Sequence, residues 1–476
     1  MTFTSFNFLV FFPLVVLLYN LIPQKGKVVF LLVVSYFFYL NMQPVYAILL
    51  LGVTLCTYFF ARWISVVLTE KKKHRLLILG VIVVISPLFF YKYFGFINDS
   101  VTSLLESTGI AISLPRITYM LPVGISFYTF MAIGYLVDVY NEDIEFEKNI
   151  LSTGLFLSFF PIILSGPIER AGNLFPQFKY LRSSTYDDLV VGLKLMLWGY
   201  FMKLCVADRL GLYVDAVFDN LSHHNGTTLA FASVLYPFQV YADLGGYSLI
   251  AIGVARCLGI KVIENFHRPF FATSMSEFWR RWHISLIKWL TDYIYTPLSF
   301  SLRSWRMWGI FTALMLTFLI SGIWHGAALT FIVWGFIQGV YLCIDAAMNK
   351  KRTRLENKYN LKNKWWWILV CCVLVFVLFA FSQIFGRCGR VEEAIEVIKK
   401  IFEERGKLFV DTMSVVLGGI FLFILFVKDF ADEFGRRFQL LSLKWKVIRY
   451  FYISFLIAAI VLFGVLDGGQ FIYFQF

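Results

Sequence analysis

A histidine in the middle of a long apolar stretch is the residue of this chain best suited to chemistry. His325 lies in "SGIWHGA", residues 321–327, with Ser321 and Trp324 close by. Histidine can take up and release a proton near neutral pH, and an ionisable residue inside a membrane is costly enough to indicate function. The alternative is a core histidine that ties helices together by hydrogen bonds.

A second histidine, His283, lies in the stretch "ATSMSEFWRRWHISLIKWLTDYIYTPL", residues 272–298. Ser274 and Glu277 have the spacing of a capping box, which predicts that a helix begins there. We expect that helix to end at Pro297. In one continuous helix, a polar stripe is formed by Glu277, Arg281, Ser285, Lys288 and Asp292. The opposite, apolar face is formed by Trp279, His283, Leu286 and Leu290.

This helix has two interpretations. In the first, it lies at the headgroup level of a bilayer, with tryptophan anchors and basic residues on phospholipid. In the second, it forms an anion site facing the cytoplasm, where Arg280, Arg281 and Lys288 meet the phosphates of a CoA-like donor. A buried His283 beside that site would then serve the chemistry.

Two other polar groups occur in apolar surroundings. Glu169 and Arg170 follow a Gly-Pro turn in "LSGPIERAGNLFPQF", where they either pair with each other or line a cavity. Asp243 precedes two glycines in "YADLGGYSL". The chain lacks a phosphate-binding loop, a serine-hydrolase elbow and a zinc-protease motif, and its seven cysteines show no C-x-x-C spacing. We therefore expect no metal site.

Composition identifies the elements that must position these groups. The chain of 476 residues is 59% hydrophobic and 15% charged, whereas soluble proteins carry about 25% charged residues. Apolar runs long enough to cross a bilayer recur throughout, the first at about residues 5–22, which we interpret as a membrane helix and not as a cleaved signal. The sequence predicts an all-α polytopic membrane protein with about 10 to 12 transmembrane helices.

The net charge of +13 comes largely from basic loops between apolar runs, which the positive-inside rule explains without nucleic acid. The loops 71–75, 267–306 and 349–364 are then cytoplasmic, and the N-terminus is outside. Residues 307–346 therefore form a helical hairpin with "SGIWHGA" at its turn. We expect the glycines of region 229–260 to break a helix there, and residues 387–408 to form an amphipathic surface helix.

Several segments together resemble the membrane-bound O-acyltransferase (MBOAT) family, in particular its branch of alginate O-acetylation and D-alanyl-teichoic-acid transfer proteins. They are "LPVGISFYTF", "SGPIER…FPQF", "ADLGGYS", "ENFHRPF…TSMSEFWRRWHISL" and "SGIWHGA". The resemblance implies one membrane-embedded acyltransferase domain over 1–476. Re-entrant and interfacial helices would surround a central tunnel, and residues 268–346 would hold the donor-side helix and catalytic hairpin.

The resemblance also implies roles for residues. His325 would be catalytic and His283 the second functional histidine. Further candidates for the donor site or tunnel are Trp324, Ser321, Arg280, Arg281, Lys288, Trp282, Asp243, Glu169 and Arg170. The chain departs from the alginate-type pattern at Gly245, Leu249, Thr291, Ser299 and Phe300, which puts alginate itself in doubt as the substrate.

The implied reaction moves an acyl group, in the first place acetyl, across the membrane for O-acetylation of an extracytoplasmic or cell-surface polysaccharide. Acetyl-CoA or another cytoplasmic thioester would be the donor, and no permanently bound cofactor is expected. The implied partners are the lipid bilayer of a bacterial cytoplasmic (inner) membrane, an extracytoplasmic serine-type acetyltransferase and the polysaccharide acceptor, but no nucleic acid. One alternative is D-alanyl transfer to teichoic acid from an acyl carrier protein, and another is a polysaccharide or lipid transporter or flippase.

Overall fold

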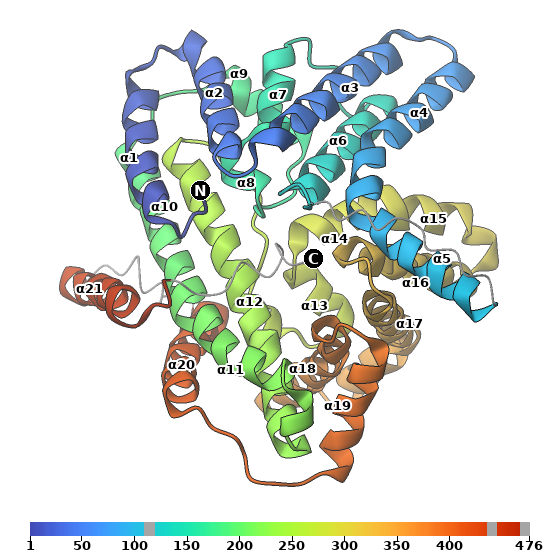
Figure 1. Ribbon diagram of the computed structural model, residues 1–476, viewed down its shortest axis with the longest axis vertical. Helices are drawn as coiled ribbons and strands as arrows, with labels where there is room; N and C mark the ends of the chain where they lie inside the picture. Colours follow the sequence, from blue (N-terminus) through green and yellow to red (C-terminus); the bar gives the residue numbers. More distant parts are fainter. Residues whose placement is uncertain (109–119, 436–444, 467–476) are drawn as a thin grey trace. The chain divides into compact units, whose positions relative to one another are not determined.

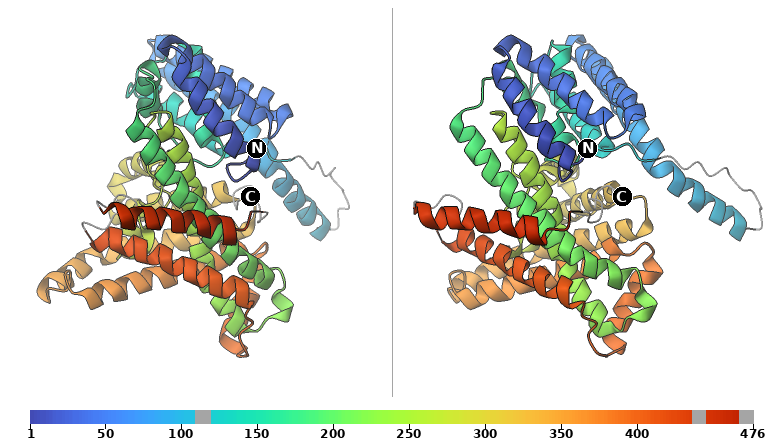
Figure 2. Two further views of the ribbon diagram at one scale, coloured as in Figure 1. Left: turned by 90° about the vertical axis from the view of Figure 1, so that its left-hand side faces the viewer. Right: turned by 60° about the vertical axis from the view of Figure 1, so that its left-hand side comes forward.

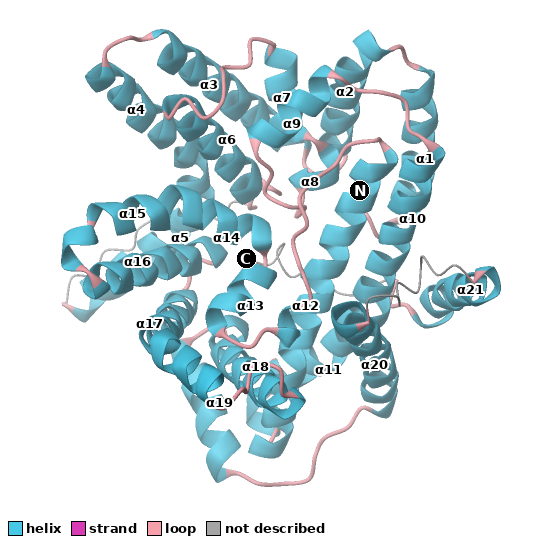
Figure 3. Cartoon of the chain, turned by 180° about the vertical axis from the view of Figure 1, so that it is seen from behind, coloured by secondary structure: helices cyan, strands magenta, loops and turns pink. Residues whose placement is uncertain are grey.

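The described chain is built from helices joined by loops. The computed structural model describes residues 1–108, 120–435 and 445–466, and these ranges contain no β-strand (Figure 3). Within them, nine helices are long and apolar enough to cross a membrane, and three shorter apolar helices accompany them. The predicted all-α polytopic membrane fold is confirmed.

The chain forms two compact units, Met1–Leu193 with Ala251–Ile263 and Lys194–Ile250 with Glu264–Phe476. The helices that begin in the first unit are α1 (Phe6–Leu21), α2 (Lys27–Leu40), α3 (Ala47–Val66), α4 (Glu70–Leu88), α5 (Phe94–Ser107), α6 (Ile125–Tyr140), α7 (Ile150–Ser158), α8 (Phe160–Ile163), α9 (Ala171–Lys179) and α10 (Tyr186–Tyr200). Among them α3, α4 and α6 pack on one another (Figure 1).

The second unit holds both histidines of interest. Its helices are the π-helix η4 (Phe201–Ala207), α11 (Asp208–Phe218), most of α12 (Gly226–Cys257), α13 (Met275–Arg281), α14 (Ile284–Leu290), the π-helix η7 (Thr291–Tyr295), α15 (Thr296–Ser301), α16 (Met307–His325), α17 (Leu329–Lys358), α18 (Trp365–Arg387), α19 (Val391–Glu403), α20 (Thr412–Phe434) and α21 (Lys446–Phe463). The surface helix expected within 387–408 is α19. α20 and α21 (Figure 2) approach each other at one point, where the rings of Phe421 and Phe463 lie 6.0 Å apart.

The glycines of region 229–260 do not break a helix, so that prediction was wrong. α12 is continuous over 32 residues. A Cβ atom on Gly246 would lie 2.8 Å from the carbonyl oxygen of Gly199 and 2.9 Å from the backbone nitrogen of Lys203. Small residues let helices approach closely in membranes. Gly246 therefore serves the packing of α12 against α10 and η4.

The outward faces of the long helices are apolar, as lipid contact requires. In α18, Leu369, Val373 and Val377 are exposed, whereas Phe379, Ser382 and Gln383 are buried. A soluble helix would show the reverse, with its polar residues outside. The polar side chains of α18 are therefore directed into the protein interior.

Candidate active site at a membrane hairpin

The predicted hairpin is present, and His325 lies at its turn. α16 ends at His325 and α17 begins at Leu329. The two helices touch at a pair of glycines, since a Cβ atom on Gly322 would lie 3.2 Å from the Cα atom of Gly335 and would collide with the carbonyl of Phe331. His325 itself is partly exposed. It can therefore meet a substrate while remaining fixed at the end of a packed helix.

His283 lies at a break between two short helices, not on the face of one long helix. α13 ends at Arg281 and α14 begins at Ile284, and His283 adopts left-handed backbone angles with φ 46°. Ser274 caps α13 as predicted, its side chain accepting a hydrogen bond from the backbone N–H of Glu277. Non-glycine residues adopt the left-handed conformation rarely, and such strain concentrates at functional sites.

The break overturns two details of the sequence interpretation. The stripe from Glu277 to Asp292 is not one exposed face, because Ser285 is buried and donates its hydroxyl hydrogen to the Asn265 side chain at 2.9 Å. Pro297 does not end a helix, because helical backbone continues without a break from α14 through the π-helix η7 into α15, which ends at Ser301.

Asn265 holds the break in place. Its backbone oxygen accepts the N–H of Ile284 at 2.8 Å, and its side-chain oxygen accepts the N–H of Ser285 at 3.2 Å. Its side-chain nitrogen donates to the hydroxyl of Ser248 at 3.0 Å. The sequence interpretation did not select Asn265, although an asparagine before "FHRP" was visible as a candidate for binding backbone.

A chain of aromatic rings connects the two histidines. The His283 ring lies 6.0 Å from the Trp324 ring, which lies 5.0 Å from the His325 ring. On its other side, His325 meets Trp334 edge-on at 4.9 Å. The structure thus brings together His283, Trp324 and His325, which were all predicted as site residues, and adds Trp334, which was not.

Trp334 rests on a buried polar network. Its ring lies 5.9 Å from the ring of Trp279, whose indole N–H donates to the side-chain oxygen of Gln338 at 3.2 Å. Gln338 in turn donates to the hydroxyl of Ser382 at 2.6 Å. Both Gln338 and Ser382 are fully buried. This network fixes the ring that packs against His325.

His283 is neutral under physiological conditions. Burial lowers the pKa of its ring from the usual 6.5 to about 3. A buried ring in apolar surroundings disfavours the imidazolium form because that form loses its hydration. The His283 ring therefore carries one hydrogen-bond donor, one acceptor and no positive charge.

The neutral state of His283 predicts acid-sensitive stability. Its pKa is near 3 in the folded protein and about 6.5 in the unfolded chain, so the unfolded state binds more protons between these values and stability falls as pH drops below about 6.5. The loss should reach about 2 kcal/mol at pH 5. The thermal midpoint of His283→Gln should therefore fall less between pH 7 and pH 5 than that of the native protein. Replacing exposed His223 by glutamine is the control, and equal pH slopes for the native protein and His283→Gln would contradict the prediction.

The three predicted donor-side cations lie in different environments. Arg281 is held by two carboxylates, Glu277 at 2.6 Å and Glu433 at 3.0 Å. Arg280 and Lys288 are exposed, and no carboxylate pairs with either of them within the described ranges. Only Arg280 and Lys288 are therefore free to meet an anionic ligand. Trp282 is buried in aromatic packing, 4.9 Å from Phe379.

Asp243 takes part in a buried ion cluster. The amine of Lys203 contacts Asp243 and also Asp208, the latter at 2.7 Å. All three belong to the packed helices η4, α11 and α12 of the second unit. Ser321 lies one turn before His325 and is fully buried.

Glu169 and Arg170 belong to the first unit. Glu169 is buried and accepts hydrogen bonds from Asn173 at 2.8 Å and from the backbone N–H of Ile263. Burial raises the pKa of Glu169, and these hydrogen bonds oppose the rise. Its observed contacts tie the segment after the Gly-Pro turn to the segment ending at Ile263.

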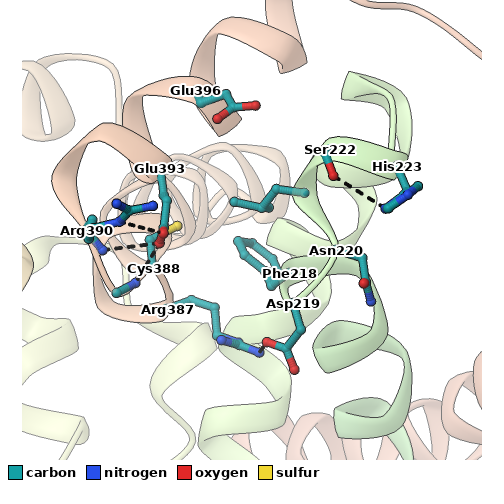
Figure 4. Close-up of a pocket in the computed structure, with 12 residues that line it drawn as sticks. Phe218, Asp219, Asn220, Ser222, His223, Arg387, Cys388, Arg390, Glu393 and Glu396 are labelled. Atoms are coloured by element: carbon teal, nitrogen blue, oxygen red, sulfur yellow. Dashed lines mark hydrogen bonds and ion pairs between the residues drawn. The ribbon is translucent and has the colours of Figure 1, made fainter.

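A polar cavity of about 540 Å³ lies elsewhere in the second unit, between the end of α11 and the junction of α18 with α19 (Figure 4). None of the predicted site residues lines it. Its main charges are already paired, since Arg387 contacts Asp219 at 2.7 Å and Arg390 contacts Glu393 at 2.9 Å. Nothing in its lining demands a ligand.

Comparison with known proteins shows the family of this chain. The model of the membrane-bound O-acyltransferase family matches residues 148–385, which include both histidines. The probable alginate O-acetylase AlgI of Pseudomonas aeruginosa is 35% identical over 84% of this chain and 75% of its own length. The peptidoglycan O-acetyltransferase of Helicobacter pylori is 30% identical over 78% of this chain and 72% of its own. The teichoic acid D-alanyltransferase of Bacillus subtilis is 27% identical over 56% and 69%.

The matches extend well beyond the hairpin, and the described helices have the length and composition of membrane spans. The chain belongs to the membrane-bound O-acyltransferase family and is a multi-pass membrane enzyme of acyl transfer.

Proposed function

We propose that this enzyme transfers acetyl from a cytoplasmic thioester, such as acetyl-CoA, to a hydroxyl group. The transfer serves the O-acetylation of an extracytoplasmic or cell-surface polysaccharide. The observation that carries the proposal is the meeting of His283 and His325 on Trp324 at the turn of a membrane hairpin. The names of the relatives support the acyl group and the acceptor class, since they include O-acetylases of alginate and of peptidoglycan.

In the proposed reaction, His325 acts as the general base. The hydroxyl oxygen attacks the thioester carbonyl carbon while the imidazole takes the hydroxyl proton. The carbon–sulfur bond then breaks, and the departing thiolate receives that proton from the imidazolium. Such assistance is worth about 10²- to 10⁴-fold in rate. Neutral His283 would hold the donor or its thioester by a hydrogen bond.

The exposed cations Arg280 and Lys288 fit the donor in this scheme. They belong to α13 and α14, the helices that flank His283. The phosphates of a CoA-like donor form charge-assisted hydrogen bonds with such groups. By the positive-inside rule, the basic segment that contains them faces the cytoplasm, where thioesters are made.

The acceptor side follows from the same topology. The product would be passed to polysaccharide either directly or through an extracytoplasmic serine-type acetyltransferase, at the bacterial inner membrane. D-alanyl transfer to teichoic acid is the second candidate, supported by the match to the Bacillus subtilis enzyme. In that case the donor is an acidic acyl carrier protein, and Arg280 with Lys288 would help to dock it.

The acyl group can be identified on the product. Cells with the native chain, cells with His325→Ala at equal membrane abundance and cells without the chain would be compared for acetyl and D-alanyl esters on surface polymers. We expect acetyl esters only with the native chain. If D-alanyl esters depend on the chain instead, the carrier-protein alternative is correct, and if neither ester does, the proposal fails.

A further inference from the structure

Three buried polar atoms on the two hairpin helices near His325 have no hydrogen-bond partner in the described part of the chain. They are the hydroxyl of Ser321, the hydroxyl of Thr330 and the indole nitrogen of Trp334. These residues are 0%, 1% and 4% exposed. Buried polar groups in proteins nearly always have a partner, so a group of three near one histidine requires an explanation.

The positions of these three residues in the two hairpin helices place all of them within about one helical turn of His325 or of Trp334, which contacts it. Ser321 lies four residues before His325, and Thr330 lies four residues before Trp334, so each pair shares one helix face. The ring of Trp334 contacts that of His325 at 4.9 Å. The crossing of Gly322 with Gly335 holds α16 against α17 at this level. The three donors thus occupy the segments of both helices that adjoin the histidine.

Ser321 differs from two other buried hydroxyls on helices of the second unit, those of Thr317 and Ser233. Thr317, one turn earlier on α16, donates to the carbonyl of Ala313 at 2.7 Å. Ser233 on α12 likewise donates to the carbonyl of Leu229 at 2.7 Å. Ser321 makes no such bond within the described residues. Its hydroxyl hydrogen is therefore available to another acceptor.

The start of α17 adds a positive end of a helix dipole. α17 is 30 residues long, and Ala328 at its N-cap provides no side-chain cap for the first N–H groups. The N-terminus of a helix favours negative charge. Thr330 lies in this first turn. The surroundings of His325 therefore suit an acceptor that becomes negatively charged.

We infer that Ser321, Thr330 and Trp334 bind the acyl carbonyl oxygen of the donor beside His325, an inference that rests on the proposed acyl transfer. When the hydroxyl attacks, the carbonyl π electrons move to that oxygen, which becomes an oxyanion. The three donors and the end of α17 stabilise it. The carbonyl then re-forms and expels the thiolate. A hydrogen-bond donor placed for an oxyanion acts mainly on the transition state.

The test removes each donor, in Ser321→Ala and Thr330→Val with nearly the same side-chain shape, and in Trp334→Phe with a smaller ring that also loosens the packing on His325. We expect at least one variant to lose about 10²- to 10³-fold in kcat, with the KM for the thioester little changed. The thermal midpoint should stay the same or rise in Ser321→Ala and Thr330→Val, because each removes a buried group without a partner. A purely structural role predicts the opposite, a lower midpoint with kcat unchanged, and that result would overturn the inference.

Thr317→Val is the matched control. It removes a buried hydroxyl that does have a partner, so it should lower the thermal midpoint and leave kcat within a few-fold of the native value. The native protein and His325→Ala, measured alongside with acetyl-CoA, report separately on the proposed function. If the native protein transfers no acetyl, the acetyl proposal fails, and the variants are compared with a D-alanyl carrier, whose acyl carbonyl needs the same donors.

Discussion

Replacing His325 by alanine is expected to reduce kcat by about 10²- to 10⁴-fold, because a hydroxyl is a poor nucleophile unless a base takes its proton. The ring stands at the end of α16, partly exposed and packed edge-on against Trp324 and Trp334. Within the described chain, His325 is the histidine whose ring contacts Trp334, so no second imidazole stands at that position to act as the base. Initial rates of acyl transfer by purified protein in lipid vesicles would measure the loss.

Two further variants separate base catalysis from packing. His325→Gln keeps a polar side chain of similar size but cannot act as a base near neutral pH, so its kcat should be as low as that of His325→Ala. His283→Gln keeps hydrogen-bonding groups in place of a ring that is already neutral, so it should retain more activity. If His325→Gln keeps kcat within a few-fold of the native value, His325 is a structural tie and not the base.

The hairpin was predictable because it depends on quantities that a sequence displays directly. About 40 mainly apolar residues lie between two basic segments, which requires two crossings and a turn. The turn falls where Gly326 follows His325, and the structure begins α17 three residues later, at Leu329. Segment length and flanking charge fixed this element, without knowledge of its neighbours.

The break at His283 was not predictable in this way. Helical periodicity from Ser274 to Pro297 is uninterrupted in the sequence, and neither glycine nor proline separates Arg281 from Ile284. The break depends on a distant segment, because Asn265 binds the backbone of Ile284 and Ser285 from outside the helix. A pattern within one segment cannot show that another segment replaces its hydrogen bonds.

Trp334 and Gln338 were not predicted as site residues, for a different reason. Both lie in "FIVWGFIQGV", where a tryptophan is typical of any membrane span. The glutamine was the available signal, since a polar side chain in such a run usually binds across helices. It does so here, receiving the indole N–H of Trp279 and donating to Ser382. Its link to His325 through two rings required coordinates.

The buried ion cluster gives the largest expected effect on stability. Lys203 is 4% exposed, and its amine contacts both Asp208 and Asp243. Lys203→Met keeps the length of the side chain but leaves two carboxylates buried without their cation. Removing one partner of a buried pair costs about 3–5 kcal/mol. The variant should show a strongly lowered thermal midpoint and reduced yield from membranes.

The combined variant Lys203→Met, Asp208→Asn, Asp243→Asn tests whether the cluster serves the stability of the fold or acyl transfer. It removes all the buried charge together, and replacing a whole buried ion cluster by neutral groups is often close to neutral for stability. Recovery of both the thermal midpoint and acyl transfer would mean that the cluster serves the packing of α12 against η4 and α11. Recovery of the midpoint without acyl transfer would mean that the cluster, which includes the candidate tunnel residue Asp243, takes part in acyl transfer. If Lys203→Met alone is as stable as the native protein, the cluster contributes nothing to the fold, because its two carboxylates then tolerate burial without a cation.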